Sequence, residues 1–153
     1  MSIKDDCKTL ILSVDDFTDL RRIQGFVYKH FKDSDEVSEN DVATLLNGLS
    51  GVVGLVALFP GVSPIVGTAA AITGVLTSLS TNEKQTVLNS IAEGTQYLSD
   101  EQIWLIDHES IGAVKVKLNL LMRNFKDKGF SYVYDEGVRL SYFTSEGNEF
   151  LIN

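Results

Sequence analysis

From Val42 to Asn82 the chain carries no charged side chain over 41 consecutive positions. All 34 charged residues lie in the two flanks, and both flanks are net acidic. Both prolines of the chain, Pro60 and Pro64, stand in the middle of this uncharged block. A helical segment this apolar has to be covered on every side, either by protein or by lipid. The block therefore constrains the fold and the function more than any other feature.

The uncharged block predicts two apolar helices, over about 39–59 and 64–79, joined by a tight turn. The turn signals come in the order that a hairpin needs. Pro60 disfavours helical geometry in the residue before it, Gly61 permits a left-handed turn, and Pro64 suits the first turn of a new helix. The sequence thus indicates a helical hairpin at the centre of the molecule.

Small residues recur in both predicted helices of the hairpin. Glycine inside a helix costs about 1 kcal/mol relative to alanine, and stripes of small residues allow two helix backbones to approach closely. Close packing explains these glycines whether the surroundings are lipid or protein. We expect the contact surface of the hairpin to include Gly51, Val52, Gly54, Val56, Phe59, Pro60, Gly61, Pro64, Gly67, Ala71 and Gly74.

The flanks predict amphipathic helices that cover the hairpin. One runs over 16–33, and the segment 82–128 holds the others: a helix near 82–98, a short helix that begins at Ser99, and a long helix over 110–128. Gly129 suits the C-terminal end of that long helix. The spacing of three, four and seven positions that supports it involves Ile111, Val114, Leu118, Leu121, Met122 and Phe125.

The C-terminal segment, about 130–152, changes character. Aromatic and β-branched residues alternate with turn residues, which predicts a small antiparallel sheet. The apolar run at 8–14 predicts an N-terminal strand that can join it. The expected fold is a single α+β domain over 1–153, mainly a helical bundle around the hairpin, with a strand hairpin or meander at 130–153.

A formal net charge of −8 argues against nucleic acid as a partner, because phosphate binding needs a concentrated basic surface. One stretch of the predicted long helix is locally basic. Its simplest interpretation is a solvated helix face, and the alternative is a contact face for lipid or a partner protein. The residues concerned are Lys115, Lys117, Arg123, Lys126 and Lys128.

Signals of chemistry are weak. His30 and His108 are the only histidines, and neither has the spacing of a metal-ligand pair. Cys7 is the only cysteine, so an intrachain disulfide cannot form, and we expect a buried or inert thiol. The sequence predicts no enzyme, no cofactor, no metal site and no small-molecule substrate.

Two functions fit the uncharged block. In the first, the amphipathic helices cover the hairpin of residues 42–82 in aqueous solution, and the hairpin inserts into a membrane on contact. This organisation resembles the central hydrophobic hairpin of colicin-type pore-forming domains and, less closely, a holin. The resemblance covers only the block and its turn, and it implies a pore-forming or bacteriocin-like protein. With no signal peptide in the sequence, it also implies cytoplasmic synthesis followed by membrane association or release by lysis.

In the second function, the hairpin is the core of a soluble α+β protein or a homo-oligomer interface. A binding, immunity or phage-structural role would follow, with a protein partner. The chain offers barely enough amphipathic elements to cover two apolar helices, so we expect a homo-oligomer. In this second case Val52→Asp or Ala71→Asp is expected to prevent folding.

Overall fold

One long strand, β2 (Ile111–Phe125), organises an antiparallel sheet of five strands in residues 2–152, which the computed structural model describes. Its first edge pairs along its length with β1 (Ser2–Ser13). Its second edge is shared between β3 (Lys128–Val133) and β4 (Val138–Thr144), and β5 (Glu149–Leu151) extends the sheet beyond β4. Every strand therefore connects to β2 directly or through one neighbour.

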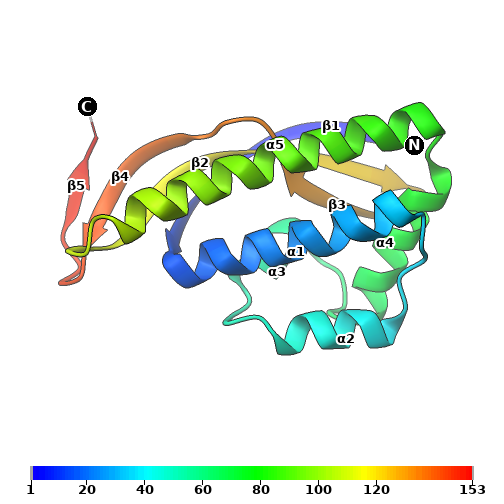
Figure 1. Cartoon of the computed structure of the whole chain (residues 1–153), viewed down its shortest axis with the longest axis horizontal. Coiled ribbons are helices and arrows are strands. Elements are labelled where there is room, and N and C mark those ends of the chain that lie inside the picture. Colours follow the sequence, from blue (N-terminus) through cyan, green and yellow to red (C-terminus); the bar gives the residue numbers. More distant parts are fainter. Residues whose placement is uncertain (1, 153) are drawn as a thin grey trace.

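Two long helices, α1 (Val14–Asp33) and α5 (Thr81–Ile106), lie side by side across the sheet and run in opposite directions (Figure 1). The uncharged block forms the shorter helices α2 (Glu39–Asn47), α3 (Val53–Leu58) and α4 (Val66–Ser78). α2 lies beyond α1, on the side away from α5, whereas α3 is seen behind α1 (Figure 1). α3 packs on α1, and α4 packs on β3 and β2. The fold is therefore helices laid on a sheet.

The predicted α+β class is confirmed, and so are the strand at 8–14, the helix at 16–33 and the C-terminal strands. The helix predicted over 110–128 is wrong, because this stretch is β2. Gly129, predicted to end that helix, lies in β3. The central arrangement as a helical bundle around a hairpin is not confirmed. Burial in β2 follows the period of a strand, with alternate residues in the core: Val114, Val116, Leu118 and Leu120.

The first predicted helix of the hairpin, over 39–59, is interrupted. α2 ends at Asn47, and α3 begins only at Val53. The second hairpin helix begins at Val66, two residues later than predicted. The helices predicted near 82–98 and from Ser99 are one continuous helix, α5, in which Ser99 is interior and Ser80 supplies the N-cap.

The hydrophobic core lies between the helices and the sheet. Phe130 of β3 stacks on Phe59 with ring centroids 5.5 Å apart, and it meets Phe31 of α1 edge-on at 5.9 Å. Phe59 follows α3, so the uncharged block contributes directly to this core. Other fully buried side chains come from all the long elements: Leu12, Phe17, Leu20, Ile23, Ile72, Val75, Ile91, Leu98 and Leu118.

Candidate interaction surface

The eleven residues predicted for the contact surface of the hairpin divide into three groups. Gly54, Phe59 and Ala71 are buried in the core. Gly67 and Gly74 are half-buried. The other six are exposed: Gly51, Val52, Val56, Pro60, Gly61 and Pro64. The structure thus buries three of the eleven residues and leaves six exposed, beside α3 and in the turn that follows it.

Exposed apolar side chains gather around α3 and the turn that follows it. Val52 is 66% exposed, Val56 is 60% exposed and Val66 is 59% exposed, which is unusual for three β-branched side chains so close in sequence. We call the three exposed valines that line the hollows beside α3, Val52, Val53 and Val56, the valine surface. A cluster of exposed apolar side chains marks an interaction site more often than a single exposed one does.

Two hollows lie beside the valine surface. A groove of about 160 Å³ lies between α3 and the turn. Its lining is Val52, Leu55, Val56, Phe59, Gly61, Val62, Pro64 and Thr68. A depression of about 360 Å³ lies on the other side of α3, where Val53 and Val56 face Leu10 and Lys8 of β1. The Nζ of Lys8 donates a hydrogen bond to the carbonyl of Ala57 at 3.3 Å, which ties β1 to the end of α3.

The groove contains a polar group that the chain does not satisfy. Thr68 is fully buried, and its Oγ1 has no hydrogen-bond partner within residues 2–152. Leaving a buried hydroxyl without a partner costs about 1–3 kcal/mol.

A buried carboxylate fixes the loop that leads into α3. Asp19 of α1 is only 1% exposed, and it accepts hydrogen bonds from the N–H groups of Ser50 at 2.9 Å and Gly51 at 3.0 Å. Arg22, three positions further along α1, donates to the carbonyl of Gly48. These contacts end α2 and position Val52 and Val53. The valine surface is therefore held by α1 in the absence of any partner.

α3 also approaches α1 unusually closely. A Cβ added at Gly54 would lie 3.2 Å from the side chain of Leu20 and 3.4 Å from that of Ile23. The glycine at this position therefore serves close helix packing, as the sequence predicted for the small residues of the block, although the neighbouring helix is α1 and not α4.

The five basic residues predicted to share a helix face are not brought together. Lys115 forms an ion pair with Glu149 at 3.0 Å, and Lys117 is exposed on the sheet. Arg123 is buried, and its Nε donates to the Tyr132 hydroxyl at 2.8 Å. Lys126 and Lys128 lie at the turn between β2 and β3. The residues follow a strand and its turn, so no continuous basic face forms.

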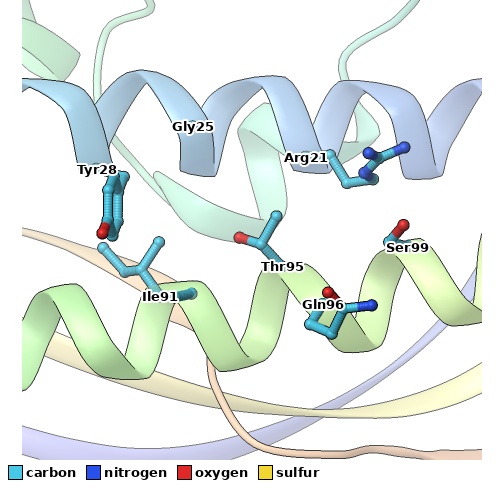
Figure 2. A pocket seen from close by; sticks show the side chains of 8 residues that line it. Arg21, Gly25, Tyr28, Ile91, Thr95, Gln96 and Ser99 are labelled. Atoms are coloured by element: carbon cyan, nitrogen blue, oxygen red, sulfur yellow. The ribbon is translucent and has the colours of Figure 1, made fainter.

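A further groove, of about 340 Å³, runs between α1 and α5. Figure 2 shows Arg21 and Tyr28 of α1 across from Thr95 and Gln96 of α5, with the bare backbone of Gly25 opening the groove between them. The residues that line it include no carboxylate, histidine or cysteine. The groove therefore offers polar contacts but no pair of groups for acid–base or nucleophilic chemistry.

The two histidines are engaged elsewhere. His30 stacks against Phe26 with centroids 4.7 Å apart, and His108 stacks on Trp104 at 4.1 Å. Neither lines either of the grooves described above. Within residues 2–152, no cluster of three His, Cys, Asp or Glu side chains could hold a metal ion. Cys7, expected to be buried or inert, is exposed.

An acidic hollow of about 310 Å³ lies between α5 and the loop after β3. Four of its six lining residues are carboxylates: Glu93, Asp100, Asp135 and Glu136. Tyr97 also lines it, and burial raises the pKa of the Tyr97 hydroxyl far above its usual value. Anionic lipid headgroups and nucleic acids are repelled by such a face.

In residues 2–152, no helix combines the length and the hydropathy needed to cross a bilayer. Comparison with known proteins found no match among protein-family models, curated proteins or solved structures. The assignment of a function therefore depends on the surfaces of this chain alone.

Proposed function

We propose that this chain is a binding protein without enzymatic activity, and that it docks an apolar segment of a partner protein on the valine surface. One observation carries the proposal. The groove beside Val52 and Val56 is lined almost wholly by apolar residues, and these two valines are 66% and 60% exposed. An extended apolar segment would cover the valines and remove their side chains from water.

The rigidity of the loop supports the same function. Asp19 and Arg22 hold the backbone between α2 and α3, so little conformational entropy is lost when a partner binds. A surface organised in this way favours recognition of a defined partner.

The chemistry of the valine surface favours protein over lipid as the partner. Segments that lie in a membrane interface carry Trp, Tyr, Lys or Arg as anchors. Residues 42–82 contain no charge, and their only aromatic residue, Phe59, is buried. The net charge of −8 also opposes binding to anionic lipid at neutral pH.

A peptide-display selection on the purified chain tests the proposal. We expect it to yield apolar peptides that bind the parent, and Val52→Asp to weaken their binding at least about tenfold, because a carboxylate in the groove must be desolvated. Val138→Asp is the matched control, since Val138 is 55% exposed and lies on β4, outside both hollows. Selected peptides that bind the Val52→Asp variant as tightly as the parent would contradict the proposal.

The exposure of Val52 also changes the expected effect of this substitution on folding. Val52→Asp was expected to prevent folding if the hairpin is core, but at 66% exposure the variant should fold. Ala71 is 1% exposed, so Ala71→Asp is still expected to abolish the folded state. Circular dichroism of both variants distinguishes the two positions.

A membrane-inserting hairpin is the second candidate function. The uncharged run from Val42 to Asn82, with its exposed turn at Pro60–Pro64, favours it. Co-sedimentation with phosphatidylcholine–phosphatidylglycerol vesicles at pH 7.5 and pH 4.5 tests it. Pelleting with release of an enclosed dye, lost in Val52→Asp and kept in Val138→Asp, would favour insertion over the protein partner. If the chain does not co-sediment with vesicles at either pH, membrane insertion is excluded as its function.

A further inference from the structure

β1 presents a long unpaired edge. Within residues 2–152 its only strand partner is β2, so the opposite edge of this 12-residue strand carries free backbone N–H and C=O groups. Such an edge is a template for another strand. Two isoleucines on β1 are also largely exposed, with Ile3 at 54% and Ile11 at 51%.

Two hydrogen bonds show which residues of β1 direct their backbone groups to the free edge. The N–H of Cys7 donates to its neighbour, the Oδ1 of Asp6, at 2.9 Å. Asn119, the partner of Cys7 on β2, uses its carbonyl to accept from the N–H of Tyr134 on the far side of β2. Cys7 and Asn119 thus form a non-hydrogen-bonded pair, and the odd-numbered residues of β1 point their backbone groups outward.

We propose that two copies of this chain form a dimer by antiparallel pairing of their β1 edges, with Cys7 of one copy opposite Cys7 of the other. The two sheets then become one continuous sheet around a two-fold axis. In this register Asp6 lies opposite Lys8 of the second copy, and by symmetry Lys8 lies opposite Asp6. Ile3 and Ile11 lie opposite each other at both ends of the interface.

The charges of β1 select this register. Odd-numbered residues must lie opposite odd-numbered residues, because only they direct backbone groups to the free edge. The two-fold axis therefore passes between one residue and the same residue of the second copy. Axes at Asp5, Asp6 or Lys8 place two like charges directly opposite each other, which is destabilising in a sheet. Axes at Ile3, Thr9 or Leu10 oppose no like charges but form no Asp–Lys pair, whereas an axis at Cys7 gives two such pairs and no opposed like charges.

The contact between Asp6 and Cys7 fits the same arrangement. In the single chain the Asp6 carboxylate accepts the outward N–H of Cys7. In the dimer that N–H donates to the carbonyl of the opposite Cys7, which frees Asp6 for Lys8 of the second copy. The local hydrogen bond is therefore replaced and not lost.

Light scattering during size-exclusion chromatography gives the first test. We expect twice the chain mass of 16.8 kDa at high concentration. Thr9→Pro removes an outward N–H without breaking the ladder to β2, and it should raise the dissociation constant about tenfold or more. Thr9→Val keeps that N–H and should leave the dissociation constant unchanged. A parent that stays monomeric, or a dimer that Thr9→Pro leaves intact, would overturn the proposal.

A cysteine series tests the register in chains whose edge is otherwise intact. Opposed residues in an antiparallel pair have Cα atoms about 5.5 Å apart, within the range of a disulfide. Mild oxidation should therefore link the parent through Cys7. In a Cys7→Ser background, Asp5→Cys and Thr9→Cys should each fail to link alone, because each lies about 13 Å from its own copy. The two variants mixed should link to each other.

The outcomes separate this interface from the valine surface. If Asp5→Cys or Thr9→Cys alone forms an intermolecular disulfide as readily as Cys7 of the parent, the proposed register is refuted. A dimer that Val52→Asp dissolves, while Thr9→Pro does not, would place the contact on the valine surface and refute pairing through β1. The proposed partner binding would stand or fall separately, on the peptide selection.

Discussion

Two threonines of α4 have opposite surroundings. The Oγ1 of Thr68 is buried without a partner. The Oγ1 of Thr73, one and a half turns later, accepts from the N–H of Val37 at 3.1 Å and donates to the Val37 carbonyl at 3.4 Å. The same hydroxyl group therefore destabilises the fold at Thr68 and forms stabilising hydrogen bonds at Thr73.

Valine, which has nearly the shape of threonine, measures this difference. Thr68→Val should raise the free energy of unfolding by about 1 kcal/mol, because it removes an unsatisfied hydroxyl. Thr73→Val should lower it by about 1 kcal/mol, since the N–H of Val37 loses its acceptor. Urea denaturation checks both, and the same sign for the two variants would contradict the assignment.

Prediction from the sequence stops short of such long-range partners. In the sequence, Asp19 is one of three acids near the start of the helix predicted over 16–33, where a carboxylate is favourable. Its actual contacts, Ser50 and Gly51, lie more than 30 positions away, and nothing in the local pattern links them. For the same reason Val52, Val53 and Val56 were predicted to lie within one apolar helix. The contact of Asp19 with the loop that interrupts this helix was not predicted.

α5 crosses β3 closely enough to require glycine. A Cβ at Gly94 would fall 1.7 Å from the carbonyl oxygen of Val133. The edge of β3 is also held by α1, because the Nε2 of Gln24 donates to that same carbonyl at 3.3 Å. Helices α1 and α5 are thus both fitted to the backbone of one strand.

Gly94→Ala should lower the free energy of unfolding by more than about 2 kcal/mol, because α5 and β3 must separate. Gly25→Ala is the matched control. Gly25 lies in α1 with no atom within 4 Å of an added Cβ, so alanine should stabilise by about 1 kcal/mol through helix propensity. Thermal unfolding of the two variants gives the comparison, and a neutral Gly94→Ala would mean that the helix lies further from the strand.

The start of α5 has a pH dependence of known sign. The Ser80 N–H donates to the Glu83 carboxylate at 3.1 Å, and this bond holds the pKa of Glu83 below its usual value. A lowered pKa in the folded state means that the stabilisation is present above the ordinary value of 4.5 and is lost as the pH falls. The stability difference between the parent and Glu83→Gln should therefore be positive at pH 7 and shrink below pH 4.5. A difference that grows on acidification would contradict the capping contact.

β2 shows why an element can be assigned to the wrong class. Its apolar residues match a helical spacing over Ile111–Phe125, but the stretch VKVKLNL also alternates strictly between apolar and polar residues. Both periods are present, and only tertiary pairing decides between them. α1 was predictable because it shows a single helical period, the second half of β1 because it is an apolar run rich in Leu and Ile, and the small C-terminal strands because their turn residues separate them.

At the scale of the whole molecule, stability is uneven. α1 buries seven of its residues and contacts α5, α3 and β1, whereas α2 buries only Val42. Amides of α2 should therefore exchange through local opening, with protection free energies at least about 2 kcal/mol below those of α1. Hydrogen exchange followed by mass spectrometry measures both helices in one sample. Equal protection would mean that α2 unfolds only with the whole domain.

The pairing of β1 with β2 also sets the order of events on the ribosome. Ser13 pairs with Ala113, so 100 residues separate them. At about 5–20 residues per second, β1 waits roughly 5–20 s for its partner strand to be synthesised. Throughout that interval the apolar run Leu10–Leu12 has no sheet to join. This run therefore stays exposed on the nascent chain for that interval, where a chaperone at the ribosome can bind it.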